Sequence, residues 1–219
     1  MDKRLAWDCA TGSGQAARGL ASRFELVIAT DASSAQLAQA EPHPRIEYRV
    51  APAEASGLES HSADIVCVAQ ALHWVDARRF FDEARRVAKP YGVVAVWGYG
   101  DPVIEGNEAN SIVYEYNRGT IEKYWLPERQ LLLDGYRTIE FPFAEVKAPA
   151  FTLEQRWTLL ELAGYLRTWS ATARYAAELG KDPVAPVEET LRRVWGGDAH
   201  RRVISWPLFL RVGRATGGT

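Results

Sequence analysis

Residues 7–14 read Trp-Asp-Cys-Ala-Thr-Gly-Ser-Gly, and Gln-Ala-Ala-Arg-Gly-Leu-Ala follows at 15–21. This order predicts a short buried strand over 5–9 that carries a carboxylate near its end, then a glycine turn, then a helix over 15–21. Glycine lets the backbone turn tightly and lets a ligand approach it closely. The amides at the start of the following helix face such a ligand. The stretch therefore predicts a cofactor site at the carboxyl end of the first strand.

Strand-like and helix-like segments alternate through the first half of the chain. Further strands are expected at 25–30, 46–50, 63–68 and 93–97, and further helices at 34–40 and 76–89. Continuous apolar strands that alternate with amphipathic helices indicate a parallel sheet covered on both faces. We therefore predict an α/β, Rossmann-like fold with a doubly wound, mostly parallel sheet of seven strands.

The alternation gives way after Trp97 to an aromatic-rich region. Residues 1–98 hold three tryptophans and two tyrosines, whereas the rest of the chain holds five and seven. Helices are expected at 108–123, 153–167, 171–179 and 187–195, and strands at 144–148 and 208–214. We predict one domain, 1–219, with a cofactor-binding core at 1–98, cap helices that enclose a substrate within 99–200, and a last strand and tail at 201–219.

Composition excludes several classes of protein. A chain of 219 residues is long enough for one substantial core, and its formal charge of −2 gives no electrostatic case for binding nucleic acid. Cys9 and Cys67 lie in apolar runs and are expected to be buried thiols of a reducing compartment. We expect no signal peptide and no membrane span, because no apolar run approaches about 20 residues. A cytoplasmic location follows as an expectation.

Acidic residues at the predicted strand ends bear on the identity of the cofactor. Asp8 lies in the first strand and Asp31 follows the second. Residues 12–17 also fit the relaxed dinucleotide pattern that ends in alanine, so a nicotinamide or flavin cofactor has to be considered. A carboxylate at position 8 would repel a pyrophosphate and attract a cation. S-adenosyl-L-methionine carries an ammonium and a sulfonium group and no phosphate, so the charge pattern favours it.

Residues 8–14 resemble the first motif of the class I S-adenosylmethionine-dependent methyltransferases, with Ala10 where that motif usually has its first glycine. Residues 29–31 are similar to the acidic end of the second strand in that family, and residues 50–54 to its adenine-side segment, with Pro52 in place of an aspartate. The resemblance implies that the carboxylate of Asp31 binds the ribose hydroxyls. The cofactor-binding residues that it implies are Asp8, Ala10, Gly12, Gly14, Asp31, Ala32, Ala53, Glu54 and Gln70.

Two further segments, 69–74 (Ala-Gln-Ala-Leu-His-Trp) and 165–170 (Tyr-Leu-Arg-Thr-Trp-Ser), are typical of the methyltransferase type 11 branch that includes trans-aconitate methyltransferase-like proteins. This resemblance implies O-methylation of a small molecule, and a carboxylic acid is the expected acceptor. His73 is either a catalytic base or a wall of the pocket, and a carboxylate acceptor needs no base. No spacing of ligands predicts a metal site. The expected substrate-pocket residues are His73, Trp74, Tyr99 and Trp169.

Alternatives remain at this stage. Arg78, Arg118 and Arg167 are candidates to clamp a substrate carboxylate, although isolated arginines are usually surface residues. Family members usually carry a helical segment before the first strand, and this chain has about four residues there. An open cofactor site, a partner subunit in a homodimer or a shortened chain would each account for this. A catalytically silent cofactor-binding or interaction protein is therefore the second hypothesis, and a nicotinamide-dependent oxidoreductase the third.

Overall fold

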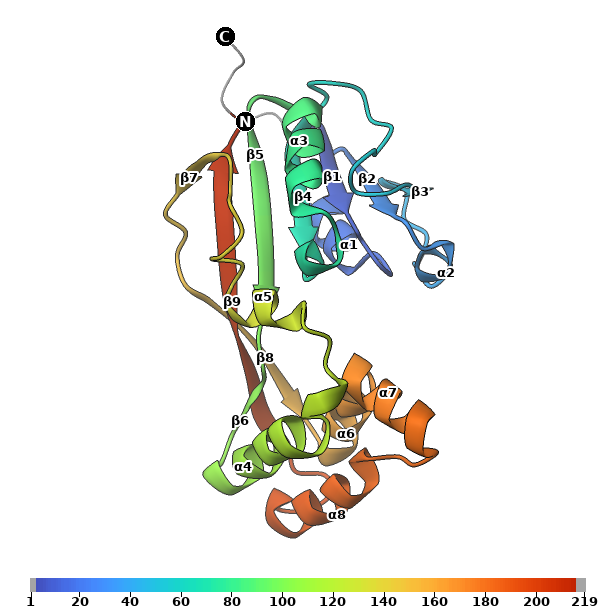
Figure 1. Cartoon of the computed structure of the whole chain (residues 1–219), viewed down its shortest axis with the longest axis vertical. Coiled ribbons are helices and arrows are strands. Elements are labelled where there is room, and N and C mark those ends of the chain that lie inside the picture. Colours follow the sequence, from blue (N-terminus) through green and yellow to red (C-terminus); the bar gives the residue numbers. More distant parts are fainter. Residues whose placement is uncertain (1–2, 216–219) are drawn as a thin grey trace. The chain divides into compact units, whose positions relative to one another are not determined.

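The computed structural model describes residues 3–215 and shows a mixed sheet of nine strands (Figure 1). Seven strands follow one another in the order β3-β2-β1-β4-β5-β9-β6, and β7 and β8 pair with β9 in addition. The predicted Rossmann-like α/β fold is confirmed, and the structure adds two strands to the predicted seven. The strands are β1 (Leu5–Cys9), β2 (Leu26–Asp31), β3 (Ile46–Val50), β4 (Ala63–Ala69), β5 (Ala88–Tyr99), β6 (Val103–Ile104), β7 (Ala144–Val146), β8 (Phe151–Trp157) and β9 (Arg202–Arg214).

The described residues group into two compact units. The first comprises residues up to 99, 130–150 and from 208 onward, and the second comprises 100–129 and 151–207. The division into a single domain with three regions stays a prediction. The α-helices are α1 (Gln15–Ala21), α2 (Ser34–Leu37), α3 (Ala77–Val87), α4 (Asn107–Glu115), α5 (Arg129–Leu133), α6 (Leu159–Arg167), α7 (Ser170–Leu179) and α8 (Val184–Trp195). None of these helices has the length and apolar character that crossing a membrane requires.

Strand β1 is buried on both faces, as its continuous apolar sequence predicts. Ala6 packs in a cluster with residues of α1, whereas Trp7 packs in another cluster with residues of α3. Successive side chains of a strand point to opposite faces, so α1 and α3 cover the two faces of the sheet. Strands β1 to β5 are parallel, and their order reverses between β1 and β4. The carboxyl ends of β1 and β4 therefore form the edge at which ligands of such sheets bind.

Strand β5 begins earlier than predicted. The expected helix at 76–89 ends at Val87, and the strand starts at Ala88 rather than at 93. Its pairing with β4 shifts register between Ala63 and Ile65, and Tyr91 has a φ of 62°. The segment at 90–92 is thus an irregularity inside the strand, which accommodates a proline and a left-handed residue without ending the ladder.

The second half of the chain differs from prediction in several segments. The helix expected at 108–123 is α4 followed by a π-helix, η2 (Tyr116–Thr120), and a 3₁₀-helix, η3 (Glu122–Tyr124). Residues 153–157 belong to strand β8 instead of a helix. Pro207 lies inside β9, between the part paired with β6 and the part paired with β5. A proline is tolerated where one set of ladder hydrogen bonds stops and another begins, since it has no N–H to donate.

Candidate functional site

The turn after β1 is built on three residues with positive φ: Ala10 at 53°, Gly12 at 58° and Gly14 at 84°. It closes through a hydrogen bond from the Gly14 amide to the Thr11 carbonyl, 3.0 Å. A Cβ atom at position 14 would lie 2.9–3.0 Å from ring atoms of Tyr48. Glycine is therefore required there for two reasons, conformation and space. Alanine at position 10 adopts the backbone conformation that the usual glycine of this motif would adopt freely.

Asp8 lies just before this turn and is fully buried. Its Oδ2 accepts a hydrogen bond of 2.5 Å from the Thr11 hydroxyl, whereas its Oδ1 is buried and has no partner among the described residues. Burial raises the pKa of the Asp8 carboxyl to about 7, although hydrogen bonds from Thr11 and the Ala17 backbone act against this. The site thus holds a carboxyl group that, when ionised, has one oxygen without a hydrogen-bond donor among the described residues.

Asp31 fastens the turn to the end of β2. Its Oδ2 accepts the Gly12 amide and its Oδ1 accepts the Ser33 amide, both at 2.8 Å. A carboxylate offers about four lone-pair positions, so two remain for a ligand. Ala32 is exposed and offers its backbone alone. The structure therefore brings Asp31 and the glycine turn together, as the sequence predicts.

The segment after β3 is tied to α3. Ala53 is buried, and Glu54 is half-buried with its Oε1 accepting the Asp76 amide at 2.9 Å. A second tie involves Glu83, which sequence reasoning missed: its Oε1 accepts the amide and the hydroxyl of Ser56, at 2.8 and 2.6 Å. Arg86 holds the same carboxylate at 2.7 Å. This ion pair, together with Ser56, lowers the pKa of Glu83 to about 2.

Gln70, at the end of β4, uses its side chain within the fold. Its Oε1 accepts the Tyr99 amide at 2.8 Å and its Nε2 donates to the Tyr99 carbonyl at 3.1 Å. Gly98 leaves room for this pair, because a Cβ there would lie 2.8 Å from Gln70 Oε1. The side chain of Gln70 is thus engaged within the fold, and a cofactor contact at this position would have to come from its backbone, which has a φ of 56°. Tyr99 is half-buried.

His73 lies on the 3₁₀-helix η1 (Leu72–Trp74) and is buried, whereas its neighbour Trp74 is 53% exposed. The Nδ1 atom of His73 is 2.7 Å from the hydroxyl of Tyr136, a fully buried residue. Burial raises the pKa of the Tyr136 phenol, and hydrogen bonds from the backbone of His73 and Leu72 partly oppose that rise. An oxygen that accepts from the backbone has its own proton left for Nδ1, so we assign Nδ1 as the acceptor of this bond.

The second unit holds the last predicted pocket residue, Trp169, in an aromatic cluster. Trp169 is buried, and its ring contacts those of Tyr116, Trp125 and Tyr165 at centroid distances of 5.7–6.0 Å. Helices α4, α6, α7 and α8 gather in this unit (Figure 1). Four aromatic residues of the second half of the chain thus pack together, with Trp169 in contact with the other three.

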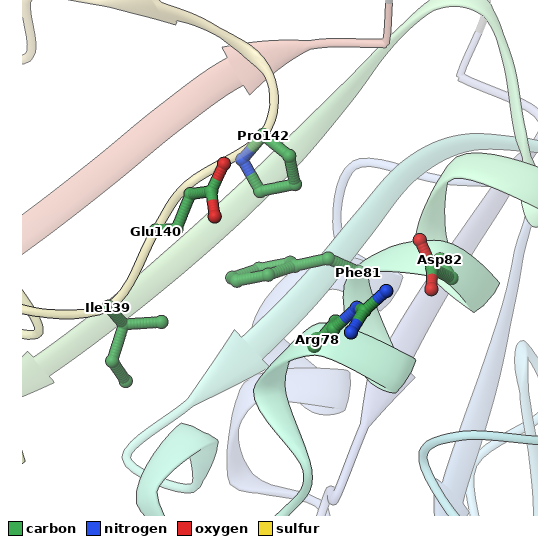
Figure 2. Close-up of a pocket in the computed structure, with 6 residues that line it drawn as sticks. All are labelled: Arg78, Phe81, Asp82, Ile139, Glu140 and Pro142. Atoms are coloured by element: carbon green, nitrogen blue, oxygen red, sulfur yellow. The ribbon is translucent and has the colours of Figure 1, made fainter.

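A separate cavity of about 460 Å³ lies in the first unit, between α3 and the segment at 139–142. Figure 2 shows Phe81 directed toward that segment, with Arg78 and Asp82 beside it on the helix. Arg78, one of the candidate clamps for a substrate carboxylate, lines this cavity, whereas the residues predicted for the cofactor site and the substrate pocket do not. It is lined by Arg78, Phe81, Asp82, Ile139, Glu140 and Pro142.

Comparison with known proteins identifies the fold and its chemistry. Residues 7–96 match the family model described as a methyltransferase domain. A Dictyostelium discoideum protein named "Putative methyltransferase" is 32% identical over 211 residues, which is 94% of this chain and 80% of that protein. The chain belongs to the class I S-adenosylmethionine-dependent methyltransferases.

A solved structure and a yeast protein are also similar to this methyltransferase, over different fractions of the chain. A solved structure from Anaeromyxobacter dehalogenans, described as "a Putative Type II Methyltransferase", is 42% identical, with a TM-score of 0.90, over 99% of this chain and 92% of that one. A Saccharomyces cerevisiae protein named "Probable S-adenosylmethionine-dependent methyltransferase" is 31% identical over 140 residues. That match covers 59% of this chain and 48% of the yeast protein.

The cofactor of the methyltransferase is S-adenosyl-L-methionine, and the described residues fit it. The unpartnered Oδ1 of buried Asp8 suits a cationic ligand, because a positive charge nearby favours the ionised carboxylate. The open lone-pair positions of Asp31 suit a pair of hydroxyl groups. The cofactor supplies a methyl group on a positively charged sulfur, and the chain's own residues bind and orient it.

Proposed function

We propose that this methyltransferase transfers a methyl group to an oxygen of a small-molecule carboxylic acid. Methyl transfer is an in-line displacement, so the protein contributes alignment and exclusion of water more than covalent chemistry. A carboxylate acceptor is already a nucleophile and needs no general base. The observation that carries this proposal is the engagement of His73 Nδ1 with the Tyr136 hydroxyl at 2.7 Å.

That contact bears on the role of His73. With Nδ1 engaged by the Tyr136 hydroxyl, this nitrogen does not serve to remove a proton from a methyl acceptor. A hydroxyl or amine acceptor that needs deprotonation gains nothing from it, whereas a carboxylate acceptor needs no base. We therefore assign His73 to the wall of the acceptor site.

The cofactor contacts are proposed from the first unit. Asp31 would accept from the ribose hydroxyls while it holds the Gly12 and Ser33 amides. The backbone at 10–14 would face the methionine part of the cofactor, and Asp8 would compensate its positive charge. Ala32, Ala53, Glu54 and the backbone of Gln70 complete the proposed set. The homodimer and the cytoplasmic location stay predictions.

Thermal stability with three ligands tests this function. A ligand present at one hundred times its Kd stabilises the folded state by about 2.7 kcal/mol, which raises Tm by several degrees for a chain of this size. We expect S-adenosyl-L-methionine and S-adenosylhomocysteine to raise Tm and NAD to leave it unchanged. Stabilisation by NAD alone would indicate an oxidoreductase. If none of the three ligands changes Tm, the chain is a catalytically silent protein.

Substitution of Asp31 adds a test of the site. Asp31→Asn keeps the shape of the side chain and removes its charge, and we expect at least tenfold weaker binding of S-adenosyl-L-methionine with a folded protein. Asp82→Asn, a change at an exposed acid of the same unit, is the matched control. Mass spectrometry of a panel of small acids incubated with the wild-type protein would then identify a methyl ester product.

A further inference from the structure

Two arginines in the second unit share one carboxylate. Asp101 pairs with Arg129 through a short contact, and Arg118 lies 3.3 Å from the other oxygen of the same residue. Asp101 follows the last residue of β5 by two positions. Arg129 is 12% exposed at its side chain, Asp101 29% and Arg118 37%. Two positive charges and one negative charge thus meet in a partly shielded place.

Arg129 contacts both Trp125 and Asp101. Its guanidinium lies over the ring of Trp125, 3.9 Å from the centroid, and the indole Nε1 of Trp125 donates to Asn117 Oδ1 at 2.8 Å. Burial lowers the pKa of Arg129, and the nearby charge of Arg118 lowers it further, against the opposing effect of Asp101. Arg129 therefore forms the closer of the two ion pairs of Asp101 and helps to hold it in place.

Arg118 is left without a good partner. Its Nε is buried and has no hydrogen-bond partner among the described residues, and its contact with Asp101 is long for a charged pair. Glu122 approaches it at 3.9 Å, but this carboxylate is 60% exposed and its attraction is screened by water and salt. A native structure seldom leaves such a donor unpaired without a reason.

The backbone that carries Arg118 is unusual as well. Arg118 and Asn117 lie on the π-helix η2, which replaces the regular helix that the sequence predicts at this point. Single π-helical turns inside helices occur frequently at functional sites, because they redirect side chains. Here the turn directs the buried Asn117 to Trp125 and Arg118 to Asp101. The contacts therefore form a closed ring that begins and ends on the π-helix and runs through Asn117, Trp125, Arg129, Asp101 and Arg118.

We propose that Arg118, held by Asp101 and the π-helix, is an anion-binding residue that receives the carboxylate of a small organic acid. Arginine is suited to this task, since its planar fork matches a carboxylate with two parallel hydrogen bonds. The choice of a carboxylate over another anion rests on the proposed function. The flat ring of half-buried Trp125 in the same cluster is able to pack against the apolar part of such an acid.

Calorimetric titration of the full chain tests the site with defined probes. Benzoate and succinate are the carboxylates, benzamide is the neutral analogue, and inorganic phosphate is the competing anion; each is titrated with and without S-adenosylhomocysteine. We expect a carboxylate to bind the wild-type protein and benzamide not to bind. Arg118→Gln is expected to weaken carboxylate binding about ten- to hundredfold, which is the effect of removing a charge-assisted hydrogen bond.

The controls separate this site from general effects of charge and folding. Arg193→Gln removes an arginine of the same unit whose side chain is 75% exposed, and carboxylate affinity should not change. Should Arg118→Gln fail to fold, Arg118→Lys keeps the charge but lacks the fork, and intermediate weakening is expected. Equal carboxylate binding by wild-type and variant protein overturns the proposal, as does binding of phosphate without either carboxylate.

The outcome for the cofactor is read independently. Binding of S-adenosylhomocysteine without binding of any carboxylate overturns the anion site and leaves the methyltransferase intact. Binding of a carboxylate that depends on Arg118, without binding of S-adenosylhomocysteine, supports the anion site and contradicts the proposed function. The two inferences therefore fail in distinguishable ways.

Discussion

His73 and Tyr136, which are 63 residues apart in the chain, lie 2.7 Å apart from Nδ1 to hydroxyl oxygen in the buried part of the first unit. Their rings are also stacked, with centroids 5.9 Å apart. The pair fixes the orientation of His73, which follows strand β4 at the cofactor edge. It also engages one ring nitrogen, so that this nitrogen has no role as a base.

Tyr136→Phe should separate this orienting role from simple packing. The ring and its contacts are retained, so we expect a loss of about 1–3 kcal/mol in the free energy of unfolding, from the hydrogen bond alone. Turnover of the methyl acceptor should fall while affinity for S-adenosyl-L-methionine stays the same. Steady-state kinetics of methyl transfer and calorimetric titration with S-adenosyl-L-methionine measure the two effects. Tyr91→Phe, at an exposed tyrosine, is the control.

Ala10→Gly should be tolerated and should not destabilise the protein. Ala10 has a φ of 53°, a conformation that costs an alanine about 1–2 kcal/mol and a glycine nothing. The gain is partly offset by about 0.4–1 kcal/mol, because glycine makes the unfolded chain more flexible. Urea unfolding should therefore give equal or greater stability. Ala16→Gly in α1 should instead lower the free energy of unfolding by about 1 kcal/mol. A similar decrease for Ala10→Gly would contradict the inference that Ala10 is strained.

Asp8→Asn should change how stability depends on pH. The folded-state pKa of Asp8 is raised from 3.8 to about 7, so the folded state holds its proton when the unfolded state has lost it. Stability of the wild-type protein then falls as pH rises from about 4 to 7. The variant lacks this loss and should gain up to about 4 kcal/mol relative to wild type by pH 8. Asp82→Asn should show no such trend in denaturation measured at pH 5 and pH 8.

Cofactor binding should lower the pKa of the Asp8 carboxyl, which burial raises. A cation beside the Asp8 carboxyl favours its ionised form, so binding of S-adenosyl-L-methionine near pH 6.5 should release a proton. Calorimetry in two buffers with different ionisation enthalpies measures the number released. A proton count of zero in wild-type protein would separate Asp8 from the cofactor, and Asp8→Asn should give zero in any case.

Glu83→Gln should loosen the segment that follows β3. The variant keeps a polar side chain but loses the charge that Ser56 and Arg86 share, and we expect a loss of about 2–3 kcal/mol at pH 7. The wild-type pKa of about 2 lies below the ordinary 4.5, so this contribution is present above pH 4.5 and disappears as pH falls through 2. Wild-type and variant proteins should therefore converge in acid unfolding. Glu189→Gln, at an exposed ion pair, is the control.

Local pattern predicts the first unit well for a physical reason. Strands β1 and β3 and helix α1 have the predicted bounds, because apolar runs, cap residues and glycine turns act over a few residues. Asp76 caps α3 locally, with its side chain accepting the Arg79 amide. Where a partner far away in the chain decides the structure, prediction was wrong: residues 153–157 are a strand because β9 is there to pair with β8.

The stretch at 7–14 by itself determined the strand, the glycine turn and the acidic side chain beside it, and that side chain favoured a cationic cofactor over a pyrophosphate. Only the tertiary structure decided that Asp8 keeps one oxygen without a partner, that Tyr136 orients His73, that Glu83 holds the segment after β3, and that Arg118 is left under-paired. The reason is the distance along the chain over which each property is determined. Backbone conformation and charge next to a turn depend on sequence neighbours, whereas burial, pKa and hydrogen-bond pairing depend on residues that folding brings together.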